Sequence, residues 1–379
     1  MARVALNGRL LVPGKLEGIG RFTQRCLEEL VARRPHDEFL LLVDQPIHPS
    51  HRLGANVEVR RVVVPGRRPW LLRLWFGLVM TWTLKRWRAD ALVSLEGPLA
   101  MGMPASFPQL SVIHDLNFVH HPDWLPRRWA RYYNRWFPAF ARRANVLGTV
   151  SECSRQDLAD TYGIKRERVV VIPNAADESF VPLAPESKAD AQQRYAGGSA
   201  YFVYVGSLHP RKNIGGLLAA FESYRAAGGT HALVVVGASM WGGMQEVLST
   251  EAAPYVHWAG RLNDESLAQA MGGAECLLFL PWFEGFGIPL LEAMACGVPV
   301  IASNVTSIPE VCGGAAFALH DPTDIEGVAA SMKAIDEDNK AKRAAIERGL
   351  VRASEFGWAR SGALLDAAVD SLLELPQEP

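Results

Sequence analysis

Short aliphatic and β-branched runs alternate with longer stretches of helical periodicity along this chain, and this alternation limits its fold more than any other feature. Each run is apolar at almost every position, which is typical of strands buried in a parallel sheet. Helical patterns such as 21–33 and 128–142 separate the runs, so we predict an α/β protein with doubly wound parallel sheets. The predicted strands are 4–6, 39–43, 57–63, 91–94, 110–113, 146–150 and 169–172, followed by 201–205, 233–236, 256–258, 276–279, 298–302 and 316–319.

A proline-containing polar stretch at 173–185 interrupts this alternation and is typical of a linker. We therefore predict two Rossmann-like domains in tandem, 1–178 and 179–356, and a last segment at 357–379. In open α/β sheets, ligands bind beyond the carboxyl ends of the strands. Two such domains that face each other would place the site in the cleft between them.

The composition is that of a folded protein from a reducing compartment. Apolar residues make up 49% and charged residues 21% of the 379 positions. None of the five cysteines forms a C-x-x-C pair, so we expect neither a disulfide framework nor a zinc site. We expect no signal peptide, and the uncharged stretch 74–84 is shorter than the roughly 20 residues of a membrane span. These features predict a cytoplasmic protein.

Charge is divided unevenly between the two predicted domains. Residues 1–178 hold 26 Lys and Arg against 17 Asp and Glu, whereas 179–379 hold 13 against 23. A basic domain indicates an anionic partner, which is a membrane surface, a phosphorylated acceptor or a nucleic acid. No nucleic-acid-binding motif accompanies the basic residues, so we expect no nucleic-acid partner.

The segment 281–300 has the pattern of an anion site. A predicted strand ends in a loop with two glycines, and Pro289 then stands where a helix begins. A helix start reached through a glycine-rich turn presents N–H groups and a positive dipole end to an anion. Glu284 and Glu292 lie eight positions apart in this segment. Carboxylates accept hydrogen bonds from sugar and ribose hydroxyls, so a nucleotide sugar would explain both the anion site and the acids.

This segment resembles the E-x7-E signature of the retaining GT-B glycosyltransferases of family 4, in the form E-G-F-G-I-P-x-x-E-A-M-A-C-G-x-P-V. The resemblance implies that Glu284 contacts the transferred sugar and Glu292 the ribose hydroxyls. It also implies that the backbone of the intervening loop holds the sugar and the diphosphate. That loop consists of Gly285, Phe286, Gly287 and Ile288. By the same resemblance, 1–178 is the acceptor-binding domain, 179–356 is the donor-binding domain, and a helix in 357–379 crosses back to the first.

A second stretch agrees with this family. Residues 201–213 form a strand, a glycine turn and a basic pair before a helix, and Lys212 matches the lysine that pairs with the donor phosphates. Ser207 stands where the family commonly has arginine, which is a departure. We hypothesise that Arg211 supplies the missing charge, and the alternative is a surface arginine at a helix start.

Two stretches of the first domain also match. Gly18, Ile19 and Gly20 open a helix after the first strand, where the family has a loop that closes over the donor diphosphate; a plain strand–helix turn is the alternative. His114 follows the strand 110–113 and is followed by aspartate, as in the family, which implies a histidine beside the transferred sugar. A structural histidine is the alternative. Asn174 resembles the family's P-N-G turn, with alanine in place of glycine.

The resemblance implies retention of anomeric configuration without a covalent nucleophile, with the leaving phosphate accepting the acceptor's proton. His114 and Glu284 would then be the catalytic residues. The one D-x-D sequence, at 336–338, lies in a charged helical run and is expected to be solvated surface, so we predict no metal and no cofactor beyond the nucleotide sugar.

Seven of the eleven tryptophans lie between Trp70 and Trp136, interleaved with arginines in 67–88 and 126–143. This pattern suits helices that lie on an anionic membrane, here the inner face of the cell membrane, and a core helix with a basic exposed side is the alternative. Family members often glycosylate lipid-linked acceptors, so we expect a lipid-linked or glycan acceptor. The sequence around His114 resembles that of bacterial polysaccharide mannosyltransferases, which makes GDP-mannose the first candidate donor. A non-hydrolysing nucleotide-sugar epimerase and a non-catalytic nucleotide-sugar-binding protein are the rival functions.

Overall fold

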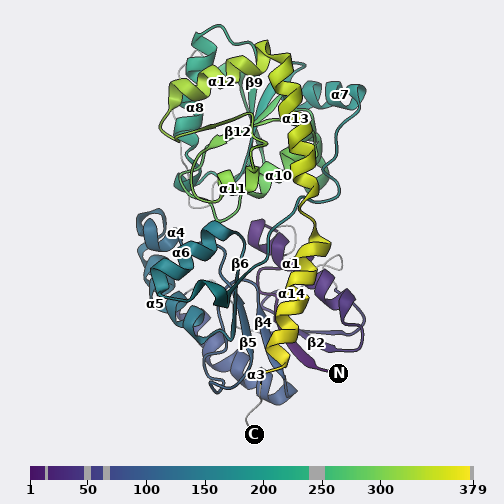
Figure 1. Ribbon diagram of the computed structural model, residues 1–379, viewed down its shortest axis with the longest axis vertical. Helices are drawn as coiled ribbons and strands as arrows, with labels where there is room; N and C mark the ends of the chain where they lie inside the picture. Colours follow the sequence, from purple (N-terminus) through teal and green to yellow (C-terminus); the bar gives the residue numbers. More distant parts are fainter. Residues whose placement is uncertain (13–15, 47–52, 63–68, 239–251, 376–379) are drawn as a thin grey trace. The chain divides into compact units, whose positions relative to one another are not determined.

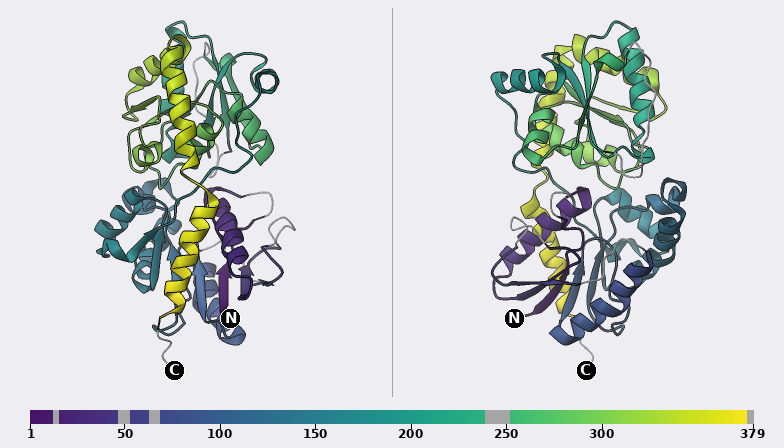
Figure 2. Two further views of the ribbon diagram at one scale, coloured as in Figure 1. Left: turned by 45° about the vertical axis from the view of Figure 1, so that its right-hand side comes forward. Right: turned by 180° about the vertical axis from the view of Figure 1, so that it is seen from behind.

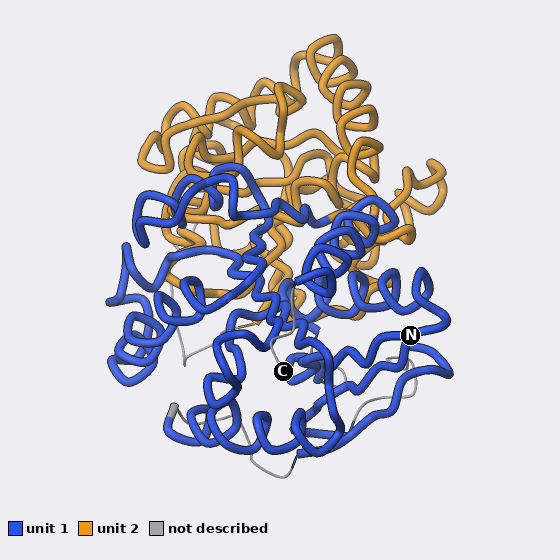
Figure 3. The backbone as a smooth tube through the Cα atoms, turned by 60° about the horizontal axis from the view of Figure 1, so that its bottom comes forward, with its two compact units in different colours: residues 1–174, 358–379 blue, residues 175–357 orange. Residues whose placement is uncertain are grey.

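The computed structural model describes residues 1–12, 16–46, 53–62, 69–238 and 252–375. The chain folds as two compact units, which we call unit 1 (residues 1–174 and 358–379) and unit 2 (residues 175–357) (Figure 3). The last helix, α14 (Trp358–Leu373), therefore belongs to unit 1 although it follows unit 2 in the sequence.

Unit 1 is built on a parallel sheet of seven strands in the order β3-β2-β1-β4-β5-β6-β7 (Figure 1). All seven runs predicted in this half are confirmed as strands, although residue 63 of the run 57–63 lies outside the described residues. The aliphatic side chains of β1, β2, β4 and β5 are buried between helices on both faces, whereas the edge strand β3 is largely exposed. Val4 of β1 lies in register with Phe39 of β2 on one side and Ala91 of β4 on the other. The strands are β1 (Arg3–Asn7), β2 (Glu38–Val43), β3 (Val57–Arg61), β4 (Ala91–Ser94), β5 (Gln109–Val112), β6 (Val146–Thr149) and β7 (Val169–Val171).

Helices cover both faces of this sheet. On one face, α1 (Gly18–Arg33) and α14 lie side by side (Figures 1 and 2), and Arg34 fastens them through an ion pair with Asp366 at 2.5 Å. On the other face, a core cluster joins the sheet to a longer helical segment and to α5 (Arg127–Arg143). That segment consists of α2 (Pro69–Leu74), the π-helical turn η2 (Trp75–Val79) and α3 (Met80–Trp87). Shorter helices are α4 (Asn117–His120), η3 (Pro122–Trp124), α6 (Glu152–Tyr162) and η4 (Arg166–Arg168).

Unit 2 has a parallel sheet of six strands in the order β10-β9-β8-β11-β12-β13. The six predicted runs are again confirmed as strands. They are β8 (Tyr201–Val205), β9 (Ala232–Val236), β10 (Val256–Gly260), β11 (Cys276–Phe279), β12 (Val300–Ser303) and β13 (Ala318–His320). The helices are α7 (Pro185–Ala196), η5 (Pro210–Lys212), α8 (Ile214–Ala226), η6 (Ala253–Tyr255), α9 (Asp264–Gly272), α10 (Ile288–Ala295), α11 (Ile308–Cys312), α12 (Ile325–Glu337) and α13 (Asn339–Ser354).

Two helix layers enclose this second sheet as well. α8 and α12 pack together against a core cluster on one face, whereas α10 contacts α13 and α9. Glu275, just before β11, forms ion pairs with Lys188 of α7 at 2.8 Å and with Lys342 of α13. Burial by itself would raise the pKa of Glu275, but the two lysines outweigh it and lower the pKa to about 2. This carboxylate therefore stabilises the contact of two helices with the amino end of β11.

Each sheet has one point where the direction of chain progression reverses. In unit 1 the chain moves outward from β1 to β3 and then returns to the other side at β4, so the reversal lies between β1 and β4. In unit 2 the reversal lies between β8 and β11. The loops that follow two such neighbouring strands diverge, and the opening between them is the usual ligand site of doubly wound sheets.

Candidate active site

The reversal point of unit 2 brings three predicted residues together. Arg211 and Lys212 stand in η5, after β8, and Glu284 stands in the loop after β11. Lys212 Nζ donates a hydrogen bond to Glu284 Oε1, and Arg211 forms an ion pair with the same oxygen at 2.7 Å. The sequence predicted that the two cations bind phosphate and that the acid binds sugar; in the structure the cations and the acid are paired with one another.

This cluster contains two cationic side chains and one carboxylate. Burial by itself would raise the pKa of Glu284, but Arg211 and Lys212 outweigh that effect and hold the pKa below its ordinary value. Both Lys212 and Glu284 keep only 9% of their side-chain surface exposed. Lys212 Nζ also lies 4.9 Å from the centre of the Phe279 ring. The cluster therefore carries a net charge of one positive unit in a shielded position, which suits an anion.

Local backbone features hold the two cations in place. His209 caps η5, because its Nδ1 accepts a hydrogen bond from the Arg211 N–H at 3.2 Å. Arg211 also donates through its guanidinium to the Phe283 carbonyl at 3.0 Å. The preceding turn needs Gly206, at φ 156°, because a Cβ there would lie 2.8 Å from the Tyr204 hydroxyl. Arg211 is therefore a fixed part of the cluster rather than a loose surface residue.

Three hydroxyl side chains at the end of β12 and in the segment that follows it bind the loop that carries Glu284, and no sequence pattern predicted them. Ser303 donates to the Pro281 carbonyl at 2.7 Å, and Ser307 donates to the Glu284 carbonyl at 3.0 Å. Thr306 Oγ1 accepts a hydrogen bond from the Glu284 N–H at 3.1 Å. Thr306 adopts φ 48°, a conformation that β-branched residues rarely take. This local strain indicates that the surrounding contacts hold Thr306 where the Glu284 loop needs it.

The helix after this loop begins where the sequence predicted. Gly287 is the N-cap of α10 at φ 100°, and a Cβ there would lie 2.8 Å from Leu290 Cδ1. Gly285, Phe286 and Ile288 complete the turn, and the Phe286 ring is buried in an edge-to-face contact with Phe356. Two of the four residues of this turn are thus glycines without side chains, and a third has its ring in the core. Glu292, one turn into α10, is buried.

In unit 1, His114 lies just beyond the end of β5. Its Nε2 is 2.8 Å from the Leu95 carbonyl, which fixes the proton on Nε2 and leaves Nδ1 as an acceptor. Burial lowers the pKa of His114 despite opposing effects of Leu95 and Asp115, so the ring is neutral at neutral pH. The ring meets Phe22 of α1 edge to face at 4.9 Å, and Ser154 donates to the His114 carbonyl at 3.1 Å. His114 is thus held rigidly in one tautomer.

The three residues predicted for a diphosphate loop form the first turn of α1. Gly18 and Ile19 are exposed, and Gly20 is buried, where a Cβ would lie 3.0 Å from the Leu10 carbonyl oxygen. The nearby residues 13–15 lie outside the described residues. These three residues therefore stand at the start of a 16-residue helix, and their role toward a diphosphate stays a prediction.

A buried ion pair at the reversal point of unit 1 was not predicted. Arg9, after β1, forms a two-pronged ion pair with Glu96, after β4, and one of its bonds measures 3.1 Å. Asn7 donates to Glu96 at 2.7 Å as well. Glu96 keeps 3% of its side-chain surface exposed, and it raises the pKa of Arg9 although burial by itself would lower it. The sequence contained one indication of this cluster: Asn7 is a polar residue at the end of a buried strand.

Two other predicted features have plain structural explanations. The D-x-D sequence lies at the surface as predicted, since residues 337 and 338 are exposed, but Asp336 is partly buried: it accepts a hydrogen bond from Tyr224 at 2.7 Å and pairs with His231 at 2.9 Å. Asp338 caps α13. Among the described residues, no three His, Cys, Asp or Glu side chains are grouped closely enough to hold a metal ion. Asn174 is buried and is the last residue of unit 1 before the chain enters unit 2.

Two glycosyltransferase family profiles match successive parts of the chain. The profile described as Glycosyltransferase Family 4 matches residues 16–180, and the profile described as Glycosyl transferases group 1 matches residues 186–351. The chain is also similar to O-antigen chain mannosyltransferase B of Escherichia coli, with 28% identity over 90% of this chain and 93% of that protein.

Solved structures share the fold over nearly the full length. Sucrose-phosphate synthase from Thermosynechococcus elongatus superposes with a TM-score of 0.78 at 18% identity, covering 98% of this chain and 99% of the other. Anabaena HepE, solved in complex with UDP-glucose, superposes with a TM-score of 0.72 at 18% identity, covering 98% and 100%. The predicted GT-B fold with two Rossmann-like sheets is confirmed.

Proposed function

The chain belongs to the family 4-like glycosyltransferases of the GT-B fold, and from this premise we propose that it transfers mannose from GDP-mannose to a lipid-linked or polysaccharide acceptor, with retention of anomeric configuration. The choice of mannose is supported by the O-antigen mannosyltransferase, which this chain resembles over most of both lengths. A nucleotide sugar as donor is supported by HepE, whose structure was solved with UDP-glucose.

The observation that carries this proposal is the cluster of Arg211, Lys212 and Glu284 at the reversal point of unit 2. When the bond to the sugar breaks, negative charge builds on the leaving diphosphate and positive charge on the sugar ring. Arg211 and Lys212 would stabilise the diphosphate together with the N-terminal turn of α10, and Glu284 would bind the sugar hydroxyls. Both kinds of charge are thus met by groups that the fold holds in position beforehand.

His114 would act on the sugar as a neutral hydrogen-bond acceptor. Its Nε2 is occupied by the Leu95 carbonyl, so Nδ1 offers its lone pair to a sugar hydroxyl. The lowered pKa keeps this lone pair available at neutral pH. We assign no covalent nucleophile: the leaving phosphate accepts the proton of the attacking hydroxyl, and the new bond forms on the face from which the diphosphate departs.

We propose that the reaction needs no divalent metal, because two cationic side chains and a helix start would stabilise the charge of the leaving group. Turnover should therefore persist in EDTA, and a loss of turnover that manganese restores would contradict the proposal. Retention is tested separately by nuclear magnetic resonance of the product, since the anomeric coupling constant reports the configuration. An inverted product would exclude the proposed mechanism.

For the acceptor, we propose binding in unit 1 near Arg9, Glu96 and Asn7. This buried polar group lies beyond the carboxyl ends of β1 and β4, which is the usual ligand position in such a sheet. An ion pair that is already complete would bind hydroxyl groups of a glycan rather than a second charge. Replacing Arg9 with lysine keeps the charge but not the forked geometry, and it should raise the KM for the acceptor more than the KM for the donor.

A direct test begins with a panel of nucleotide sugars and the intact protein. A ligand at about 100 times its dissociation constant stabilises the folded state by roughly 2.7 kcal/mol, so GDP-mannose should raise the melting temperature more than UDP-glucose or UDP-N-acetylglucosamine. Transfer of labelled mannose to a lipid-linked glycan would then establish the activity. Conversion of the nucleotide sugar to an epimer without any acceptor would favour the epimerase function instead, and binding without turnover would favour a non-catalytic role.

We also propose contact with an anionic membrane surface at the inner face of the cell membrane, through α2, η2 and α3. The side chains of Trp70, Leu74, Leu78 and Trp82 are all exposed there, with 57%, 38%, 66% and 62% of their surface accessible. These four residues, which we call the apolar stripe, are spaced four apart. An ideal helix would turn such a row by about 40° at each step, and the wider π-helical turn of η2 falls in the middle of the row.

The second predicted membrane segment differs. In α5, Trp129 and Trp136 pack against the core cluster of unit 1, so this helix has a basic exposed side and buried aromatic residues. Residues 67 and 68 of the first segment lie outside the described residues. Among the described residues, no helix combines the length and apolar character needed to cross a membrane. Flotation with anionic vesicles tests the proposed contact, and absence of binding to them would contradict it.

A further inference from the structure

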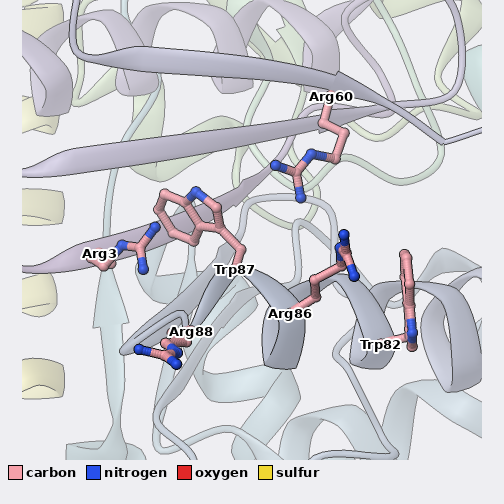
Figure 4. Close-up of a pocket in the computed structure, with 6 residues that line it drawn as sticks. All are labelled: Arg3, Arg60, Trp82, Arg86, Trp87 and Arg88. Carbon is pink, nitrogen blue, oxygen red and sulfur yellow. The ribbon is translucent and has the colours of Figure 1, made fainter.

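A pocket of about 570 Å³ lies in unit 1 between the last turns of α3 and the strands β1 and β3 (Figure 4). Four arginines and two tryptophans line it: Arg3, Arg60, Trp82, Arg86, Trp87 and Arg88. None of these belongs to the residues proposed above for donor, sugar or acceptor. The pocket is therefore separate from the residues assigned to the transfer reaction.

Two of the four arginines are already paired. Arg3 donates to Glu38 at 3.1 Å and lies 4.5 Å from the Trp87 ring centre, and Arg60 donates to Glu58 at 3.1 Å. These pairs neutralise Arg3 and Arg60 and hold their side chains at the wall of the pocket.

The other two arginines give the pocket its net positive charge. Arg86 contacts the ring of Trp82 at 5.5 Å, and Arg88 ends α3 in the left-handed conformation at φ 56°. Both are exposed, and neither has a carboxylate partner among the residues that the structure describes. Asp90, the nearest acid in sequence, accepts a hydrogen bond from the Arg3 backbone at 2.7 Å. The geometry therefore leaves two guanidinium groups for an anion.

The pocket is continuous with the apolar stripe. Trp82 is the last residue of the stripe and also lines the pocket, and Arg86 follows four positions later on the same helix. The opposite side of this segment is buried through Trp75, Phe76 and Leu84. An apolar row that ends in a cationic pocket matches a molecule with an apolar part joined to an anionic head.

We propose that this pocket binds the phosphate headgroup of an anionic phospholipid while the apolar stripe enters the surface of the bilayer. The proposal rests on the membrane contact proposed above and adds a defined headgroup site to it. Guanidinium groups suit phosphate oxygens because they donate in a planar fork. The exposed face of Trp82 matches the boundary between headgroups and acyl chains, where tryptophan is enriched in membrane proteins.

The test uses the intact protein and vesicles of phosphatidylcholine with or without phosphatidylglycerol. The pocket variant combines Arg86→Gln with Arg88→Asn, since asparagine tolerates the left-handed conformation of residue 88. It should bind the anionic vesicles about thirtyfold more weakly, because each arginine near an anionic surface contributes roughly fivefold. The matched control, Lys340→Gln with Arg343→Gln, removes two exposed charges from α13 of unit 2 and should change binding by less than about twofold.

A short-chain phosphatidylglycerol, kept below its micelle concentration, tests the pocket without a bilayer. By calorimetry it should bind the wild-type protein saturably and the pocket variant at least tenfold more weakly, and inorganic phosphate should bind far more weakly than the lipid. Inorganic phosphate binding as tightly as the lipid would overturn the proposal, as would equal lipid binding by the variant.

Failure of the headgroup site and failure of the membrane contact are distinguishable. Trp70→Ser with Leu78→Ser removes apolar surface outside the pocket, so it should lower vesicle binding but leave the short-chain lipid affinity unchanged. If the wild-type protein binds the short-chain lipid but no vesicle, the membrane contact fails and the pocket stands. If it binds vesicles but the pocket variant does so equally well, the contact stands and the headgroup site is refuted. Transfer to a water-soluble acceptor should be unchanged in all these variants.

Discussion

Replacing Glu284 and replacing Lys212, each in a separate variant, should change the affinity for a nucleoside diphosphate in opposite directions. In the structure Lys212 and Arg211 are both engaged by Glu284, so a diphosphate must compete with this carboxylate for the two cations. Lys212→Met removes a cation and should weaken GDP binding. Glu284→Gln removes the competing charge and should strengthen GDP binding, although it should abolish most turnover because the sugar loses its ligand.

The magnitudes follow from the charges and their burial. A hydrogen bond to a charged group contributes about 1.5–3 kcal/mol, so Lys212→Met should raise the dissociation constant of GDP roughly ten- to hundredfold. Neutralising Glu284 raises the net charge of the cluster from one to two positive units. At about 6 Å and an effective dielectric constant of about 20, one unit charge contributes at most about 3 kcal/mol, so we expect GDP to bind more tightly, by at most about a hundredfold.

Calorimetric titration of both variants with GDP and with GDP-mannose measures these changes, and a transfer assay gives kcat. Exposed residues of α13 provide matched controls, since Lys340→Met and Glu347→Gln make the same changes of charge far along the chain from the cluster. Both controls should bind GDP as the wild type does. If Glu284→Gln weakened GDP binding as much as Lys212→Met, the carboxylate would not compete with phosphate, and the assignment of the two cations would be wrong.

Three further changes test the structure around the site. Glu275→Gln should lower the free energy of unfolding by about 3 kcal/mol at neutral pH. The difference in unfolding free energy between variant and wild type should vanish as pH falls from about 4.5 to 2, because the wild-type carboxylate, with a pKa of about 2 in the folded protein, becomes protonated there. Urea unfolding at several pH values measures this difference. Arg9→Met leaves Glu96 buried without its partner and should lower the free energy of unfolding by about 3–5 kcal/mol. The double variant Arg9→Met with Glu96→Leu should recover most of this loss. If it recovered none, the unpaired buried carboxylate would not be the cause of the loss. Thr306→Val keeps the shape but removes the acceptor of a backbone hydrogen bond, so unfolding free energy should fall by about 1–3 kcal/mol and kcat should fall with it, whereas Thr306→Ser should change neither.

The central strands could be predicted from sequence because they are buried along their whole length, whereas the edge strands β3, β10 and β13 are more exposed. A run such as 201–205 is apolar throughout, and the structure buries the whole of β8. The sequence also allowed the prediction that Lys212 and Glu284 lie close together, since loops after parallel strands collect at one edge of a sheet. What the pattern did not contain was the pairing itself, because an ion pair between residues 72 positions apart depends on the strand order.

Contacts made across the fold account for the features that sequence reasoning missed or left open. Arg9 and Glu96 are 87 positions apart and meet only because β1 and β4 are neighbours. The tryptophans of α5 have the same arginine-rich surroundings as those of α3, so the sequence could not separate an interfacial helix from a core helix. The structure separates them, because Trp136 packs against the core whereas Trp82 is 62% exposed.

The pairing of Glu284 with two cations also bears on how such a site can exist before its substrate binds. Two buried cations without a counter-charge would repel each other and lose hydration, which costs several kcal/mol per ion. Glu284 removes most of this cost, since the three groups together carry a single net charge. In the proposed reaction the diphosphate takes over Arg211 and Lys212, and the displaced carboxylate becomes available to the sugar. Sugar binding by Glu284 would then depend on an occupied phosphate site, so a free hexose should bind measurably only when a nucleoside diphosphate is present.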